Sequence, residues 1–549
     1  MEIICNNQEE KKEKRVMNIL LKNALVYDGE GGVPYKSDVL VVGEKIAQVG
    51  DRLNEEGAQV LELEGLSVSP GFIDAHSHND WFAIKKEPLK YFEPFVRQGI
   101  TSFIGGNCGL SATGFEHSSA YKDKLGAGLF NLNDVTGEYA TLNEYFNAID
   151  GKIPMNMAML MGHCSARTSV AGYENRDLNA SELERMLSIL EKGLEEGACG
   201  LSLGLEYEPG LYAPIEELKD VASLCEKYDL PMVVHSRACS TVSTAYPELF
   251  GRPHILRALD ELEEITKGTK MKLQYSHAIF LGERSLKYKN DVIEILDRMR
   301  SNGVNVMFDI FSGDTAVTVI TIIMPAWFQA LSSQDKKKPF HKIRFSVMAK
   351  VASALLGIGF DNMRIAYAGK GNERYEGKTV QEIAEELGIS DINAYLYLCE
   401  ISNYSGRIFM RPYNTEEITN SLSKHDNMLF MTDAWVVEEG LQHQSIYDCL
   451  PKFLHQSLNG KGDTFSRTIR KMTGATADRF LLKNRGYIKP GYFADITIFD
   501  ENKLKDGVAV LGDSFGIKMV FINGRKVLEY GRLDETAFQT AGHALRAEK

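Results

Sequence analysis

Side chains of the kinds that bind zinc or transfer protons stand directly after short apolar segments of this sequence. They are His76, His78, Cys108, His235, His277 and Asp433. Imidazole and thiolate are the ligands that zinc prefers, and a carboxylate can complete the coordination or act as a base. Taken singly, each residue has an ordinary structural interpretation, because a buried cysteine or a hydrogen-bonded histidine needs no metal. Their common position makes them a candidate metal site, with Asp433 as the candidate base.

The segments before these residues read as strands of a parallel sheet. Apolar β-type runs alternate with amphipathic helical stretches, which is the pattern of a parallel sheet covered by helices. Eight runs can be counted: LSVSPGFID, TSFIGG, NMAMLMG, GLSLGL, PMVV, KLQYS, NVMFDI and MLFMT. Eight repeats favour an α/β fold of the closed (β/α)8 TIM barrel type, in which the carboxyl ends of the strands meet at one face. The candidate ligands would therefore converge on one centre.

Another histidine, His163 in MGHCSAR, also ends a predicted strand. We favour hydrogen bonding behind the site over metal ligation for this residue. A structural or surface role is expected for His117, His254, His341, His425, His455 and His543. No G-x-S-x-G, G-x-x-x-x-G-K-[ST] or H-E-x-x-H motif is present, so serine hydrolase, P-loop and zincin chemistry have no support.

The two ends of the chain lack the alternation of apolar runs and helical stretches that is typical of the middle. Residues 18–66 and 484–549 are short β-rich runs with turns, and each is too small to fold alone. We therefore predict one small β-sandwich domain built from both ends. The barrel would span residues 67–483. Residues 315–427 break the alternation, which predicts an insertion covering the active site, and residues 1–17 form a charged N-terminal tail.

Composition narrows the class of partner. The formal charge of −13 and the isoelectric point near 5.5 argue against nucleic acid or an anionic membrane as a partner. No segment reaches the roughly 18 apolar residues of a membrane helix, and the eight cysteines have no framework spacing. We expect a cytoplasmic protein with free thiols that acts on a small molecule. The sequence leaves a homo-oligomer open.

Several motifs together resemble one enzyme family. They are PGFIDAHSHND, GGNCGLS, GACGLSLGLEYEPGLYA, VVHSR, QYSHA, MTDA and PGYFADITIFD. In this order, from about Asn18 to the C-terminus, they resemble the D-aminoacylase (N-acyl-D-amino-acid deacylase) branch of the amidohydrolase superfamily. The cysteine of GGNCG stands where the superfamily more often has a carboxylated lysine.

The resemblance implies a metal-dependent hydrolase of carbon–nitrogen bonds other than peptide bonds, with one or two zinc ions per chain. Cys108, His235 and His277 would match the tightly held zinc site. His76 and His78, sharing Cys108, would match a weaker second position. Zinc polarises a carbonyl and lowers the pKa of bound water to about 7. Asp433 would be the general acid and base that takes the proton of water and delivers it to the leaving nitrogen.

The chain departs from the family at the positions that would bind the substrate. Relatives that cleave simple N-acyl-D-amino acids hold the free carboxylate with a lysine, tyrosines and an arginine. This chain has Ile279, the pair Phe311 and Ser312, and Ser445 at the matching positions. Arg237, Arg167 or Lys452 could compensate, although a surface position or a structural ion pair explains each of them equally well. Each lost charge-assisted contact costs about 1.5 to 3 kcal/mol, so we expect a less anionic substrate in a more apolar pocket.

Two rival functions remain open at this point. One is hydrolysis of a cyclic amide, as in hydantoinases and dihydroorotases, against which the cysteine in place of lysine weighs. The other is a catalytically inactive relative that binds a metabolite without converting it. The complete set of candidate ligands together with Asp433 argues against the second rival.

Overall fold

A computed structural model describes residues 18–126, 130, 137–243, 245–246, 251–329, 331–507 and 516–548. The predicted charged tail, residues 1–17, lies outside them. Within the described chain, no helix is both long and apolar enough to cross a membrane.

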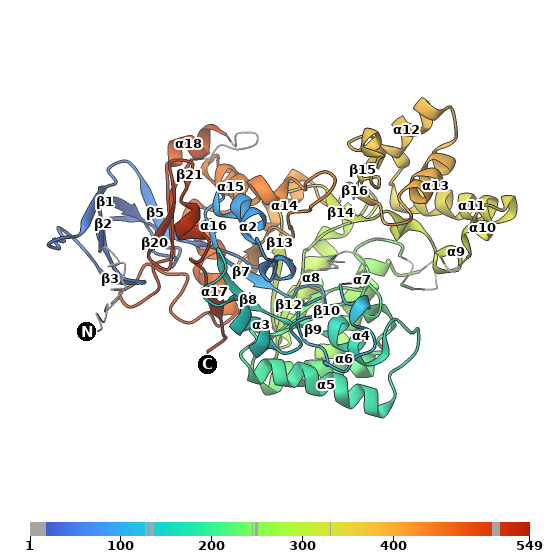
Figure 1. The fold of residues 1–549 in the computed structure, drawn as a ribbon, viewed down its shortest axis with the longest axis horizontal. Helices are drawn as coiled ribbons and strands as arrows, with labels where there is room; N and C mark the ends of the chain where they lie inside the picture. Colours follow the sequence, from blue (N-terminus) through green and yellow to red (C-terminus); the bar gives the residue numbers. More distant parts are fainter. Residues whose placement is uncertain are drawn as a thin grey trace, which may run out of the picture.

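Two parallel sheets form the centre of the molecule (Figure 1). Their orders are β22-β8-β7-β6 and β17-β13-β12-β11-β10-β9, and every neighbouring pair is parallel. The bounds are β6 Phe72–Asp74, β7 Ile100–Gly105, β8 Asn156–Met159, β9 Met161–Gly162, β10 Leu201–Gly204, β11 Pro231–His235, β12 Lys272–Tyr275, β13 Asn305–Ile310, β17 Met428–Phe430 and β22 Ala544–Leu545. Each of the eight predicted runs contains a strand, which confirms the α/β alternation.

Backbone hydrogen bonds connect the two sheets at both ends. Only Leu160 separates β8 from β9, and the N–H of Cys199, just before β10, donates to the carbonyl of Met159 in β8 at 2.8 Å. At the other side the N–H of Ala75, after β6, donates to the carbonyl of Phe430 in β17 at 3.4 Å. The ends of β6 and β17, which carry His76 and Asp433, are therefore neighbours.

Helices cover the outer faces of these sheets. They include α2 Leu89–Val96, α3 Leu142–Ile149, α5 Ala180–Glu195, α6 Ile215–Lys227, α7 His254–Thr266, α8 Lys289–Ser301, α15 Ser445–Leu458, α16 Phe465–Met472 and α17 Gly474–Arg479. Helix α5 shows why such segments are helical: Asn179 and Glu182 form a capping box at its start, and Met186, Leu190 and Leu194 form its buried face. Gly197 follows its end with φ +101°, a conformation that glycine adopts at little cost.

A nine-stranded sheet is built from both ends of the chain. Its order is β21-β20-β19-β18-β5-β1-β2-β3, with β4 pairing β1. The bounds are β1 Ile19–Val26, β2 Tyr35–Val42, β3 Lys45–Gly50, β4 Gln59–Glu62, β5 Ser67–Pro70, β18 Ile496–Phe499, β19 Ile517–Ile522, β20 Arg525–Glu529 and β21 Arg532–Leu533. A hydrophobic cluster including Val39, Ile46, Ile496 and Phe521 packs on it. The sandwich form and the domain boundaries stay predictions.

The run LSVSPGFID is divided between two sheets, whereas we expected it to be one barrel strand. β5 pairs with β1 and β18 of the terminal sheet, and only β6 pairs with β7. Pro70 has no N–H to donate, and Gly71 lies so close to Thr101 that a Cβ atom there would be 2.3 Å from its side chain. This Pro-Gly step therefore carries the chain from the terminal sheet into the central one.

Residues of the predicted insertion form a separate group at the right of Figure 1. It contains a three-stranded antiparallel sheet in the order β14-β16-β15, which the sequence analysis did not predict. The elements of the insertion include β14 Ala316–Val319, α11 Pro339–Leu356, β15 Met363–Tyr367, α12 Val380–Leu387, α13 Asp391–Ile401 and β16 Arg407–Met410. Its last helix, α14 Glu416–Leu422, lies apart from this group, nearer the middle of Figure 1.

A buried polar network ties the terminal sheet to strand β8. Asp495 pairs with Arg485, and it accepts hydrogen bonds from the side chain of Asn156 in β8 at 3.2 Å and the backbone N–H of Asn523 at 2.8 Å. The side chains of Arg485 and Asp495 are only 4% and 5% exposed. Removing one member of such a pair leaves an uncompensated buried charge.

We therefore predict that Asp495→Ala lowers the free energy of unfolding by about 3 kcal/mol or more. The double change Arg485→Met with Asp495→Leu should cost much less, because no unpaired charge remains. Urea or thermal unfolding checks both. Glu64→Ala, which breaks an exposed pair with Lys36, is the control and should cost less than about 1 kcal/mol. An equally small effect of Asp495→Ala would contradict the interpretation.

Candidate metal centre

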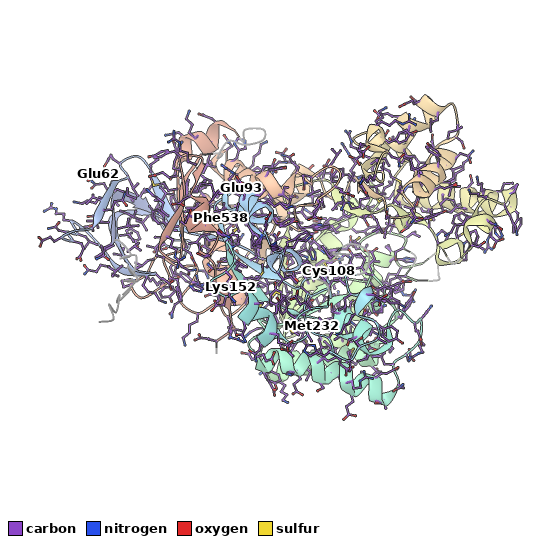
Figure 2. The ribbon with its side chains drawn as sticks, in the orientation of Figure 1. Glu62, Glu93, Cys108, Lys152, Met232 and Phe538 are labelled. Carbon is purple, nitrogen blue, oxygen red and sulfur yellow. The ribbon has the colours of Figure 1, made fainter. Side chains whose placement is uncertain are left out.

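The six predicted residues meet at the carboxyl ends of the parallel strands. The Sγ atom of Cys108, near the middle of the molecule in Figure 2, lies 3.4 Å from Nε2 of His76 and 3.5 Å from Nε2 of His277. It lies 3.7 Å from Nδ1 of His235, which in turn is 2.8 Å from Nε2 of His277. One thiol therefore faces three imidazole rings.

Asp433 completes the cluster on its other side. Its Oδ1 atom lies 3.5 Å from Nε2 of His76 and 3.5 Å from Nε2 of His78. The ligand atoms of His76, Cys108 and His277 all lie within 4.8 Å of one another, and so do those of His76, His78 and Asp433. The two groups share His76, which gives room for two neighbouring positions of a metal.

These spacings fit zinc. With Zn–S near 2.3 Å and Zn–N near 2.1 Å, the ligand atoms of a tetrahedral zinc lie about 3.5 Å apart. The three distances from Cys108 to the histidines, 3.4, 3.5 and 3.7 Å, cluster around that value. The distance between His235 and His277 is shorter and corresponds to a hydrogen bond between the two rings. The donor types and most of their distances therefore suit this metal.

Three of the six residues adopt an unusual backbone conformation. Cys108, His277 and Asp433 have φ values of +53°, +33° and +49°, in the left-handed region that residues with a Cβ seldom occupy. Each such residue costs about 1 to 3 kcal/mol and persists only where its surroundings hold it. The N–H of His277 donates to Oδ1 of Asp309 at 2.6 Å, and the N–H of Asp433 donates to the carbonyl of His76 at 3.1 Å. The fold therefore fixes these side chains at an energetic cost.

Burial sets the charges of the cluster. It lowers the pKa of His76 well below its ordinary value and that of His277 to about 3, so both rings are neutral and can offer a lone pair. Burial, together with the carboxylates of Asp433 and Asp309, raises the pKa of the Cys108 thiol. Ionising this thiol at neutral pH therefore requires a nearby cation, which a metal would supply.

Asp433 differs from the other buried carboxylates. Burial alone would raise its pKa, but hydrogen bonding with His78 and the nearby rings of His76 and His277 together outweigh this and lower the pKa below the ordinary value. By contrast, burial raises the pKa of Asp74 and of Asp309 to about 7. Asp74 accepts hydrogen bonds from Thr432, and Asp309 holds His277 and Gln274. Asp433 is therefore the ionised carboxylate at the centre. Asp74 and Asp309 hold neighbouring residues in place by hydrogen bonds.

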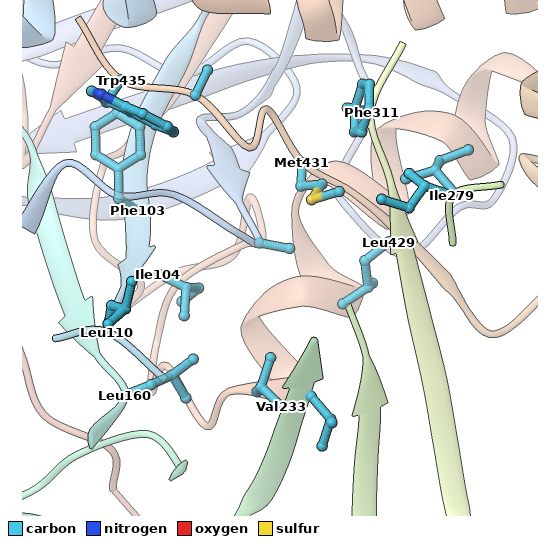
Figure 3. Close-up of a cluster of buried hydrophobic side chains, with 14 of the residues drawn as sticks. Phe103, Ile104, Leu110, Leu160, Val233, Ile279, Phe311, Leu429, Met431 and Trp435 are labelled. Carbon is cyan, nitrogen blue, oxygen red and sulfur yellow. The ribbon is translucent and has the colours of Figure 1, made fainter. Parts of the chain in front are cut away.

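A cavity opens over the cluster and is lined mostly by apolar and aromatic side chains. Ile279 and Phe311, predicted to line the substrate pocket, belong to it, and both lie in the hydrophobic group of Figure 3. The lining described for the cavity does not include Ser312, Ser445 or Arg237. Arg237 is held by Glu261 at 2.9 Å and donates to the carbonyls of Leu211 and Ala213. It therefore has the structural ion pair that was its alternative interpretation.

Comparisons with known proteins agree with this geometry. The Amidohydrolase family model matches residues 59–278. The chain is 26% identical over 518 residues to an N-acyl-D-aspartate deacylase and 26% identical over 513 residues to an N-acyl-D-glutamate deacylase, both from Alcaligenes xylosoxydans xylosoxydans. These alignments cover 93% and 92% of this chain and 92% and 93% of the relatives.

Solved structures show the same fold along the whole chain. A crystal structure of D-aminoacylase matches with a TM-score of 0.76 at 23% identity, covering 96% of this chain and 99% of that one. N-acyl-D-glutamate deacylase from Bordetella bronchiseptica, solved with zinc and a phosphonate inhibitor, matches with a TM-score of 0.75 at 22% identity, covering 97% and 100%. The chain belongs to the D-aminoacylase branch of the amidohydrolase superfamily. It is a metal-dependent amidohydrolase that acts on carbon–nitrogen bonds other than peptide bonds.

The structure of this amidohydrolase adds residues that the sequence analysis did not identify. Glu206, directly after the strand-end residue Leu205, accepts a hydrogen bond from Nε2 of His235 at 3.0 Å. His443 lines the cavity, and its Nε2 bonds the carbonyl of Thr315 at 2.9 Å. The position of Glu206 after a predicted strand was a usable signal. His443 lies between β17 and α15, where the spacing gave none.

His163 does not belong to the candidate metal cluster, and its hydrogen-bond partner is Glu217 and not a candidate ligand. Its Nε2 is 2.7 Å from Oε1 of Glu217, which also accepts from Nε of Arg167 at 2.9 Å, and all three side chains are buried. Burial alone would lower the pKa of His163, but hydrogen bonds with Cys164 and Glu217 raise it to about 9. Its folded pKa therefore exceeds the ordinary value of about 6.5 for the unfolded chain.

This shift predicts a pH-dependent contribution to stability. A raised pKa contributes stability that is fully present below about pH 6.5 and is lost as pH rises through about 9. His163→Gln should therefore be less stable than the parent by on the order of 2 kcal/mol at pH 6, and the difference should narrow between pH 7 and 9.5. Urea unfolding across this range measures it. His117→Gln, at an exposed pair with Glu144, is the control and should show little change; a difference that widens with pH would contradict the assignment.

Proposed function

We propose that this amidohydrolase hydrolyses the amide bond of a small molecule, with one or two zinc ions bound by the strand-end cluster. The observation that carries the proposal is one buried thiol within 3.4 to 3.7 Å of three imidazole rings, beside an ionised carboxylate. Such a donor set suits zinc, which when bound lowers the pKa of water and polarises a carbonyl.

The arrangement suggests which residues hold each ion. Cys108, His235 and His277 would form the tighter site, since their three ligand atoms face one another. His76 and His78 would form a second position that shares Cys108, whose Sγ is 3.4 Å from His76. A related solved D-aminoacylase is described as having a binuclear metal centre with one-metal activation and second-metal attenuation. Its fold matches this chain with a TM-score of 0.76 at 22% identity.

Asp433 is the proposed general acid and base. It stands between His76 and His78, its side chain is 21% exposed, and it lines the cavity where a substrate would enter. An ionised carboxylate there can accept a proton from the attacking water. It can then donate that proton to the leaving nitrogen, which departs poorly without one. His76 and His78 fix the orientation of the carboxylate.

The central sheets form the scaffold of the proposed site. We infer that they close into one (β/α)8 barrel, since Ala75, directly after β6, bonds β17 and Leu160 alone separates β8 from β9. In such barrels the active site lies at the carboxyl ends of the strands. Ala316, Val317 and Ile322 line the cavity, so the insertion supplies part of its wall. This supports a covering role for the segment.

The proposed substrate is not a simple N-acyl-D-amino acid. Two relatives are named as deacylases of N-acyl-D-aspartate and N-acyl-D-glutamate, and both of these compounds are strongly anionic. The described lining of this cavity contains no lysine or arginine, and Ile279 and Phe311 occupy positions where polar contacts to a carboxylate were expected. A free carboxylate would therefore be buried without a charged partner, which is costly.

We predict that Asp433→Asn abolishes turnover, with a loss of at least about 100-fold, while zinc stays bound. The amide side chain keeps the shape of the carboxylate but can no longer take the proton. Turnover of a panel of linear amides and elemental analysis of the same samples provide the measurement. Asp297→Asn on the surface of α8 is the control, because it removes the same charge from an exposed pair with His425. Unchanged turnover in Asp433→Asn would rule out this assignment of the base.

A further inference from the structure

The lining of this cavity offers no lysine or arginine, among the described residues, that could hold a substrate carboxylate. Its described lining contains two carboxylates, Glu206 and Asp433, and no lysine or arginine. The internal stretches that the structure does not describe add none, because residues 127–129, 131–136, 244, 247–250, 330 and 508–515 contain no lysine or arginine in the sequence. Asp433 has a place in the proposed reaction, whereas Glu206 has none so far.

Glu206 is held firmly at the wall of this cavity. Its Oε2 accepts from Nε2 of His235 at 3.0 Å and from the thiol of Cys239 at 3.5 Å. The side chain of Glu206 is 20% exposed, and among the described residues it pairs with His235. The nearby cation Arg237 is already engaged by Glu261. The carboxyl group of Glu206 is therefore fixed in place and has no lysine or arginine partner among the described residues.

Neighbouring side chains respond to this negative charge. Burial raises the pKa of the hydroxyls of Tyr207 and Tyr413 well above the ordinary value. Acidic neighbours raise it further: Cys108 for Tyr207, Cys239 for Tyr413, and Glu206 and Asp433 for both. Both tyrosines line the cavity. A substrate carboxylate placed beside Glu206 would meet like-charge repulsion, which costs several kcal/mol in a desolvated site.

The other side chains that line the cavity indicate which substrate groups fit there. Phe130, Tyr207, Phe311 and Trp435 supply aromatic surface, and Ile279 adds an aliphatic side chain. Contacts between rings hold part of this wall in place. The centroid of the Trp435 ring system lies 4.9 Å from that of Phe130 and 5.4 Å from that of His78. Such a surface favours an apolar or aromatic side chain on the substrate.

We propose that Glu206 is a specificity-determining residue that excludes substrates with a free carboxylate and accepts an N–H donor instead. The substrate class is then an N-acylated amine or amino-acid amide with an apolar or aromatic side chain, neutral or cationic outside the scissile bond. The proposal rests on the proposed hydrolase function. By holding His235, the same carboxylate also couples recognition to the metal centre, in the manner of carboxylate–histidine pairs around zinc.

The test compares two ligands that differ only in this charge. Racemic N-acetylphenylalanine and N-acetylphenylalaninamide are titrated calorimetrically into the zinc-loaded Asp433→Asn protein, which should bind them without hydrolysis. We expect the amide to bind at least about tenfold more tightly than the acid. Adding Glu206→Gln should reduce this ratio to about threefold or less, since glutamine keeps the acceptor for His235 but loses the charge.

Glu208→Gln in the same background is the matched control. It removes an equal charge two residues away, from an exposed side chain outside the described cavity lining that bonds Tyr212, and it should leave the ratio unchanged. Zinc content of every variant shows that the centre is intact. Equal binding of acid and amide, a ratio insensitive to Glu206→Gln, or binding of neither ligand overturns the proposal. Failure of the parent enzyme to hydrolyse an amide that it binds selectively would instead overturn the proposed function and leave the role of Glu206 standing.

Discussion

A buried thiol surrounded by carboxylates cannot ionise without a cation, and the rest of this site follows from that constraint. The pKa of Cys108 is raised by burial and by Asp433 and Asp309, so the sulfur becomes a thiolate only if a metal compensates for its charge. His76 and His277 beside it are buried and neutral, which makes them ligands and not counter-ions. The centre is therefore complete as a structure only together with a metal.

The fold holds this centre in place at some cost. Three of its residues have positive φ, and backbone hydrogen bonds hold two of them, His277 to Asp309 and Asp433 to His76. Asp309 and Asp74 belong to this support, because each bonds a backbone N–H beside a candidate ligand or the base. The fixed geometry also determines recognition. Glu206 holds His235 on one side and faces the cavity on the other, so one carboxylate links the metal centre to the choice of substrate.

Much of this arrangement could be predicted because the apolar run of a buried strand and the polar residue that follows it can be recognised in the local sequence. Each of His76, Cys108, His235, His277 and Asp433 follows an apolar run, and parallel strands must bring such positions together. The crossing at Pro70 and Gly71 was missed because an apolar run does not reveal which of two sheets it joins. His443 was missed because its role depends on a loop that folds back onto Thr315, a contact set by tertiary packing. The antiparallel sheet of the insertion pairs residues nearly a hundred positions apart, which local patterns do not encode.

Zinc content per chain tests the central claim most directly. It should be measured by elemental analysis on protein purified without added metal, in parallel for the parent, Cys108→Ala and Cys164→Ala. Cys164 is a buried thiol that bonds the carbonyl of Gly204 and is not among the candidate ligands, so its removal controls for loss of a nearby buried cysteine. The account predicts between one and two zinc ions in the parent and in Cys164→Ala, with a sharp fall in Cys108→Ala. Zinc-free parent protein, or equal zinc in all three, would contradict it.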